Sequence, residues 1–81
     1  MEKDLIKQRI CYTDLVFERV NKKLKTKMTR NEIELMILEI LSDTSTQFEK
    51  IGKNFYLSNT SKKIKLVVNA STYRLITVDK I

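Results

Sequence analysis

The sequence predicts a single two-layer α+β domain, with two helices packed on one face of a three- to four-stranded antiparallel meander (ααβββ order). Two observations support this fold class. The spacing of apolar residues changes near residue 45 from a helical period to strict alternation. The 81 residues are enough for one small domain, and only short turn-prone segments separate the predicted strands.

The first predicted helical region spans about residues 3–25. Its apolar residues recur at near-helical intervals, at Ile10, Leu15, Val16, Val20 and Leu24. Thr13 followed by Asp14 favours a helix start inside this region, because a hydroxyl can cap free N–H groups and an acid stabilises the first turn. We therefore expect a main helix over 13–25, preceded by a looser piece over 3–11.

The second helix is predicted over residues 30–42. Thr29 and Glu32 form the T-x-x-E pattern of a capping box, in which each side chain accepts a hydrogen bond from the other residue's N–H. An apolar stripe follows this pattern and consists of Ile33, Met36, Ile37, Ile40 and Leu41. Leu35 and Leu38 widen it. A stripe this wide predicts a central helix that contacts both the first helix and the strands.

Four short strands are predicted at about 47–51, 54–58, 63–69 and 73–79. Gly52-Lys53 suits a tight turn between the first two strands. Ile64, Leu66 and Val68 alternate along the third strand and should face the helices. Because no helix follows the strands, we expect the other face of the sheet to be exposed.

The composition excludes most catalytic and metal chemistry. The chain has no histidine, which removes the usual general base and the commonest metal ligand. Its single cysteine, Cys11, lies between Ile10 and Tyr12 and is expected to be a buried thiol rather than a nucleophile. One glycine cannot form a glycine-rich phosphate loop. We therefore expect no enzymatic activity, no cofactor and no metal.

The sequence also predicts a cytoplasmic protein that does not enter a membrane. No apolar run approaches the roughly 18 residues that a membrane span requires. The charged opening over residues 1–7 lacks the hydrophobic centre of a signal peptide. A single cysteine allows no internal disulfide, which fits a reducing compartment.

The net charge of +6 is unevenly distributed. Residues 19–30 and residues 50–81 each sum to +6, and the segment between them, residues 31–49, sums to −5. A basic balance favours polyanionic partners but does not determine the fold.

The first basic zone has two interpretations. Cations at the end of a helix stabilise its negative dipole end and keep the following loop solvated. Alternatively, they form an auxiliary basic patch that contacts phosphates, consisting of Lys22, Lys23, Lys25 and Lys27. A helix-turn-helix is excluded, because the second helix is strongly apolar and carries three acidic residues that DNA would repel.

The outer sheet face is the main predicted binding surface. If alternation holds, it carries one aromatic ring and three cations, at Tyr56, Lys63, Lys65 and Arg74. Rings that stack on bases and cations that meet phosphates would form a platform for single-stranded nucleic acid. Apolar residues on the same face favour a partner protein or a homodimer instead: Val67, Ile76 and Val78. A third interpretation is an ordinary half-exposed sheet whose lysines prevent edge aggregation.

Three stretches resemble a family of short bacterial proteins whose function is unknown: CYTDLVFERVNKKL at 11–24, IGKNFYLSN at 51–59 and VNASTYRLITVDKI at 68–81. The resemblance implies one compact domain of bacterial, phage or mobile-element origin and supplies no activity. Polar positions within these stretches are where we expect a site, namely Tyr12, Thr13, Glu18, Arg19, Asn21, Lys53, Asn54, Asn69, Thr72 and Arg74.

A weaker resemblance concerns two helices followed by a meander that ends in YRLITVD. This pattern is similar to the RelE/ParE-like toxin fold, some of whose members cleave RNA with Lys, Arg and Tyr. The chain departs from that fold because no strand is predicted before its helices.

The expected function is that of a small basic, non-enzymatic binding protein that acts on an anionic or nucleoprotein partner. One form of this expectation is a phage or mobile-element inhibitor of a bacterial defence complex. The alternatives are an RNA-cleaving toxin of the RelE/ParE-like type and a homodimeric interaction module. A protein or nucleoprotein complex is the first expected partner and nucleic acid the second.

Overall fold

The computed structural model describes residues 2–81 and confirms the α+β fold class. Three helices come first, α1 (Glu2–Arg9), α2 (Asp14–Leu24) and α3 (Arg30–Ser42). Four strands follow, β1 (Gln47–Ile51), β2 (Asn54–Asn59), β3 (Ile64–Asn69) and β4 (Leu75–Lys80). The fold therefore has three helices rather than two, because the break before Thr13 separates two independent helices.

The strands form one antiparallel sheet in the order β1-β2-β3-β4, as a meander requires. Gly52 begins the two-residue turn between β1 and β2 with φ 59°. This backbone conformation is one that glycine adopts without steric cost at the first central position of a hairpin turn. The predicted tight turn at Gly52-Lys53 is thus present.

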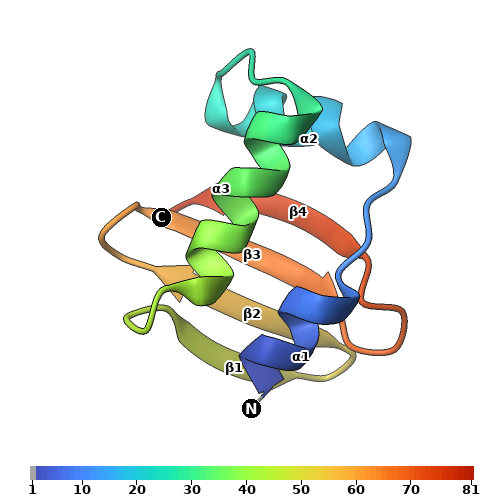
Figure 1. Ribbon diagram of the computed structural model, residues 1–81, viewed down its shortest axis with the longest axis vertical. Helices are drawn as coiled ribbons and strands as arrows, with labels where there is room; N and C mark the ends of the chain where they lie inside the picture. Colours follow the sequence, from blue (N-terminus) through green and yellow to red (C-terminus); the bar gives the residue numbers. More distant parts are fainter. Residues whose placement is uncertain (1) are drawn as a thin grey trace.

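Two of the helices, α1 and α3, cover one face of the sheet. α3 crosses in front of the strands, and α1 lies beside it over the β1 side of the sheet (Figure 1). Fully buried side chains from both layers meet between them, among them Ile6, Ile33, Ile37, Leu57, Leu66 and Val68. The face opposite this core is the one that we call the outer sheet face.

α2 occupies a different place, alongside the edge of β4 (Figure 1). The backbone of Cys11, just before α2, pairs with the start of β4 through Cys11 N–H to Tyr73 O and Leu75 N–H to Cys11 O, both 2.9 Å. Nη1 of Arg19 then donates to the carbonyl of Ile76 at 3.1 Å. These contacts satisfy part of a strand edge that would otherwise be open to another chain.

Two predictions about side-chain direction are wrong. Val78 does not face outward but is fully buried in the core, because a bulge opposite Val67 and Val68 leaves Ile76 as an extra residue in β4. Cys11 is exposed rather than buried. It alternates with Ile10 and Tyr12, which pack against the core, so its side chain points the other way.

The predicted helix starts are both at the expected residues but differ in their bonding. At α3, Thr29 Oγ1 accepts from Glu32 N–H at 3.2 Å and Glu32 Oε1 accepts from Thr29 N–H at 2.9 Å, so the capping box is confirmed. Hydrogen bonds from Thr29 to the carboxylate, first that from its backbone N–H, lower the pKa of Glu32. Thr13 is the N-cap of α2, but within the described residues its side chain makes no capping hydrogen bond.

The apolar stripe of α3 is narrower than predicted. Ile33, Ile37, Ile40 and Leu41 are buried, whereas Leu35, which was expected to widen the stripe, is 60% exposed. Across residues 2–81 none of the helices has the length and apolar character that crossing a bilayer would require.

Candidate functional site

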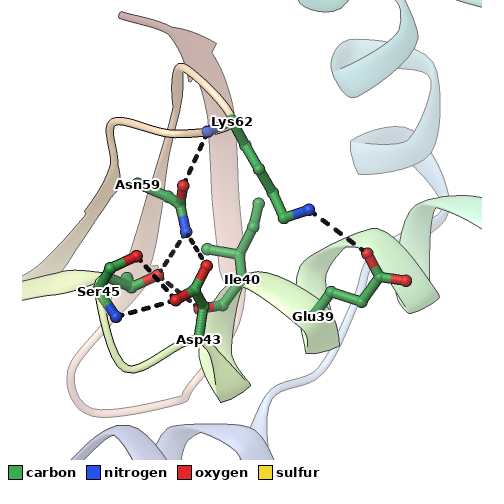
Figure 2. A network of polar contacts seen from close by, with 7 residues as sticks. Glu39, Ile40, Asp43, Ser45, Asn59 and Lys62 are labelled. Atoms are coloured by element: carbon green, nitrogen blue, oxygen red, sulfur yellow. Dashed lines mark hydrogen bonds and ion pairs between the residues drawn. The ribbon is translucent and has the colours of Figure 1, made fainter.

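The most densely hydrogen-bonded polar cluster surrounds Asn59, a fully buried residue at the end of β2 (Figure 2). Its Nδ2 donates to Asp43 Oδ2 and to Thr46 Oγ1, both at 2.9 Å, and its Oδ1 accepts from Lys62 N–H at 2.8 Å. The Thr46 hydroxyl in turn donates to the carbonyl of Ile40 at 2.7 Å. Asn59 thus links the turn after α3 to the turn after β2.

Asp43 closes this cluster on the solvent side. Its Oδ1 accepts from the N–H of Ser45 at 2.9 Å and from the Ser45 hydroxyl at 2.7 Å. The hydrogen bonds from Ser45, followed by that from Asn59, lower the pKa of Asp43 to about 2. Because each of these side chains is bonded to another part of the protein, we assign the Asn59 network a structural role.

A different arrangement occurs where α2 flanks β4. Two adjoining hollows, about 650 and 230 Å³ in volume, share Leu15 and Arg19 in their linings. We call this region the α2–β4 surface and define it by Leu15, Arg19, Lys22, Lys23, Arg74 and Ile76. Leu15 stands at its centre with 70% of its surface exposed.

The α2–β4 surface is predominantly cationic. The side chains that line its hollows include four cations, Arg19, Lys22, Lys23 and Arg74, and one acid, Glu18. Lys23 is partly neutralised, since its Nζ lies 3.2 Å from Asp79 Oδ1. Arg19 uses Nη1 to hold the Ile76 carbonyl, which orients its guanidinium and leaves its remaining N–H groups available to a ligand.

The structure does not gather the four residues predicted on the outer sheet face. Tyr56 and Lys65 do lie there, but Tyr56 pairs across strands with Glu49, and Lys65 pairs with Asp79. Arg74 belongs to the α2–β4 surface instead. Lys63 lies in the turn between β2 and β3 with φ 57°, near the end of the sheet.

The predicted auxiliary basic patch also divides. Lys22 and Lys23 are on α2 and line the first hollow of the α2–β4 surface. Lys25 caps the C-terminus of α2 in the left-handed conformation, and Lys27 is exposed in the loop that follows. Two residues of the basic patch, Lys22 and Lys23, and one of the sheet-face set, Arg74, therefore meet on a surface that neither prediction described.

The residues predicted for self-association do not form an exposed patch. Val78 is in the core, and Val67, although it lies on the outer sheet face, is only 7% exposed. The neighbouring Thr77 hydroxyl is also shielded from solvent. Ile76 is the member of this set that stays partly exposed, and it lines the α2–β4 surface.

Six of the ten polar positions singled out by the family resemblance fall into two groups. Thr13, Glu18, Arg19 and Arg74 line the two hollows. Asn21 and Asn69 instead organise turns: Asn21 bonds both the N–H and the carbonyl of Met28 at 2.9 Å, and Asn69 Oδ1 accepts from the N–H groups of Ser71 and Thr72.

Arg30, the last cation of the first basic zone, is also occupied within the protein. Its guanidinium lies 4.9 Å from the centre of the Phe17 ring and 3.3 Å from Asp14 Oδ1. The ring of Tyr12 stacks on the ring of Phe17, and the two ring centroids lie 5.5 Å apart. Burial, together with the negative charge of Glu34, raises the pKa of Tyr12 to about 12.

The sequence-based prediction included Arg19 but missed Leu15 as a site residue. A signal was available: Leu15, Arg19, Lys22 and Lys23 recur at three- and four-residue steps on α2, along one flank of the face that buries Val16 and Val20. A leucine among cations on a polar helix face is the pattern of an exposed contact residue. Among residues 2–81, no three side chains of metal-ligating type come together.

Residues 5–79 match the model of a protein family described as "Protein of unknown function (DUF3781)". Comparison with the curated proteins and with the solved structures yields no match. The findings give no support to a relationship with the RelE/ParE-like toxin fold.

Proposed function

The chain belongs to the DUF3781 family, and we propose that it is a non-enzymatic binding protein whose α2–β4 surface binds an acidic segment of a partner protein. The observation that carries this proposal is the exposed Leu15 at the junction of two hollows that four cations surround. The inhibitor of a bacterial defence complex expected from the sequence would be one protein of this kind.

The chemistry of this surface suits protein recognition. An exposed apolar side chain among charged residues is a common form of interface contact, and arginine is enriched among the residues that dominate binding energy. The cations would attract an acidic partner over several ångströms and accelerate its association. The guanidinium of Arg19, held by the Ile76 carbonyl, is already oriented before the partner arrives.

Charge on the outer sheet face favours a protein over a nucleic acid. A single-strand platform needs aromatic rings beside unpaired cations. Here Tyr56 faces Glu49 across the strands and Lys65 faces Asp79, so acidic groups accompany the ring and the lysine that would receive bases and phosphates. The α2–β4 surface carries no aromatic side chain among its defining residues.

Binding without catalysis is part of the proposal. The chain has no histidine, and its cysteine, Cys11, lies outside the two hollows as they are lined. A general base at this surface would have to be a carboxylate, and the nearby carboxylates, Glu18 and Asp79, lie among cations.

The proposal is tested by comparing what two charge-matched variants capture from lysates of the native cells. The first variant carries Arg19→Gln and Arg74→Gln, and the control carries Lys7→Gln and Lys50→Gln, which removes the same charge from exposed positions elsewhere. We expect an acidic protein that wild type and control retain and that the first variant binds at least about tenfold more weakly once purified.

Treatment of the lysate with nuclease separates the two partner classes. Capture that survives nuclease supports a protein partner. Capture that nuclease abolishes, or a partner lost equally from both variants, would contradict the proposal. Thermal unfolding of each variant verifies that the mutations leave the fold intact.

A further inference from the structure

A third hollow lies at the C-terminal end of α2, on the helix-covered side of the sheet. It has a volume of about 450 Å³, within the range of roughly 300–1,000 Å³ that is typical of small-molecule sites. Its walls come from the end of α2, the loop after it, the middle of α3, the turn after β2 and the end of β4. It shares no lining residue with the α2–β4 surface.

The inside of this hollow is apolar and adaptable. Its apolar lining consists of Leu24, Met28, Met36, Ile64 and Ile81. Two of these five are methionines, whose flexible thioethers adjust to ligands of irregular shape. The hollow therefore offers a site for a hydrocarbon group that water would otherwise surround.

The same hollow is lined by three lysines, Lys62, Lys63 and Lys80, and among its described lining residues none is acidic. The Lys62 ammonium lies 3.7 Å from Glu39 Oε2, outside the hollow's own lining. Among residues 2–81, Lys63 and Lys80 form no ion pair, and both are exposed. Two or three positive charges are therefore available around an apolar interior.

The backbone beneath these lysines is held in place on both sides. The N–H of Lys62 donates to the buried Asn59 side chain at 2.8 Å, and the carbonyl of Lys63 accepts from Ile81 N–H at 3.0 Å. Lys63 adopts φ 57°, an uncommon conformation for a residue other than glycine. On the opposite wall, Asn21 bonds both backbone groups of Met28. The hollow is thus formed before any ligand binds.

We propose that this hollow binds a small amphipathic anion, with an aliphatic tail among the methionines and a carboxylate head at Lys63 and Lys80. The charge complementarity is specific in sign: the lysines favour an anionic head, and no lining side chain is acidic. The inference is independent of the α2–β4 surface, so either proposal can fail without the other.

A series of matched ligands tests the proposal on the wild-type protein by NMR titration of methyl groups. The probes are decanoate, decylamine with the same tail and opposite charge, decanol with the tail alone, and acetate with the head alone. We expect saturable shifts at Met28, Met36 and Ile64 with decanoate, binding about tenfold weaker with decanol, and no saturation with decylamine or acetate.

Variants locate the head group. Lys63→Asn with Lys80→Gln should weaken decanoate binding about tenfold, while Lys50→Gln, an exposed lysine of β1, should leave it unchanged. Met36→Trp should block the tail by filling the hollow, with the lysines intact.

Several results would overturn the proposal. Equal shifts with decanoate and decylamine would show that charge does not matter. Decanoate shifts centred elsewhere, or no saturation at millimolar concentration, would show that the hollow is not the site. Binding to phosphatidylglycerol vesicles without any effect of soluble decanoate would assign this surface to a membrane rather than to a free small molecule.

Discussion

The Asn59 network and the α2–β4 surface are both rich in polar side chains but differ in where their bonding capacity is used. Asn59 is buried, and its side-chain donors and acceptor are bonded to Asp43, Thr46 and Lys62. On the α2–β4 surface, cations outnumber acids and surround an exposed leucine. A polar cluster whose groups bond to one another stabilises the fold, whereas one with unused donors can bind a ligand.

The largest expected effect is on stability and concerns the Asn59 network, whose polar groups bond to one another. Asn59→Ala should lower the free energy of unfolding by roughly 3 kcal/mol, because it removes several hydrogen bonds and leaves buried partners unsatisfied. Urea denaturation measures the change. Asn54→Ala is the matched control, since Asn54 is on the same strand but only partly buried, and it should change stability by less than about 0.5 kcal/mol. Similar losses in both variants would refute the distinction.

The next prediction concerns the pH dependence of the same network. The pKa of Asp43 is lowered to about 2, below its ordinary value of 3.8, because its carboxylate accepts hydrogen bonds from Ser45 and Asn59. A lowered pKa in the folded state means that ionised Asp43 stabilises the protein above pH 3.8, and this contribution is lost as the pH falls toward 2.

Asp43→Asn tests this dependence. The variant should be less stable than wild type at pH 6, and the difference in urea midpoint should shrink between pH 4 and pH 2. A difference that is constant over this range would mean that Asp43 does not act through its charge.

A smaller effect should distinguish the two threonine caps. Thr29→Ala should cost about 1 kcal/mol of unfolding free energy, because it breaks the capping box of α3. Thr13→Ala should cost clearly less, since the Thr13 side chain makes no capping hydrogen bond within the described residues and lines the smaller hollow of the α2–β4 surface. Thermal or urea unfolding measures both losses. Equal losses of unfolding free energy in the two variants would show that the Thr13 side chain also caps its helix.

The smallest expected effect on stability concerns the α2–β4 surface. Arg74→Ala should change the free energy of unfolding by less than about 0.5 kcal/mol, because the side chain is exposed and forms no ion pair among residues 2–81. A loss above 1 kcal/mol would mean that Arg74 supports the fold and would weaken its assignment as a ligand contact.

Local patterns in the sequence predicted most of the secondary structure. The capping box at Thr29 and Glu32, the turn at Gly52 and the alternation of Leu66 with Val68 each depend on residues that are neighbours in the chain. The predicted side-chain direction of Val78 was wrong because a bulge in β4 adds one residue to the alternation. No local sequence pattern marks that bulge.

The candidate site could not be assembled from the sequence for a related reason. Arg19 and Arg74 were assigned to separate basic zones, and only the packing of α2 against the edge of β4 brings them together. Asn59 was expected in the loop after the second strand, and its burial depends on the turns that it joins. Contacts between distant segments leave no periodic signal in a single sequence.

The pairing of Cys11 with the start of β4 also bears on the order in which the chain can fold during synthesis. The meander consists of contacts between successive strands and can form as each strand emerges. α2 is made early, but Arg19 must wait for Ile76, which follows 57 residues later. On the ribosome, the apolar face of α2 therefore stays without its strand partner until β4 has emerged.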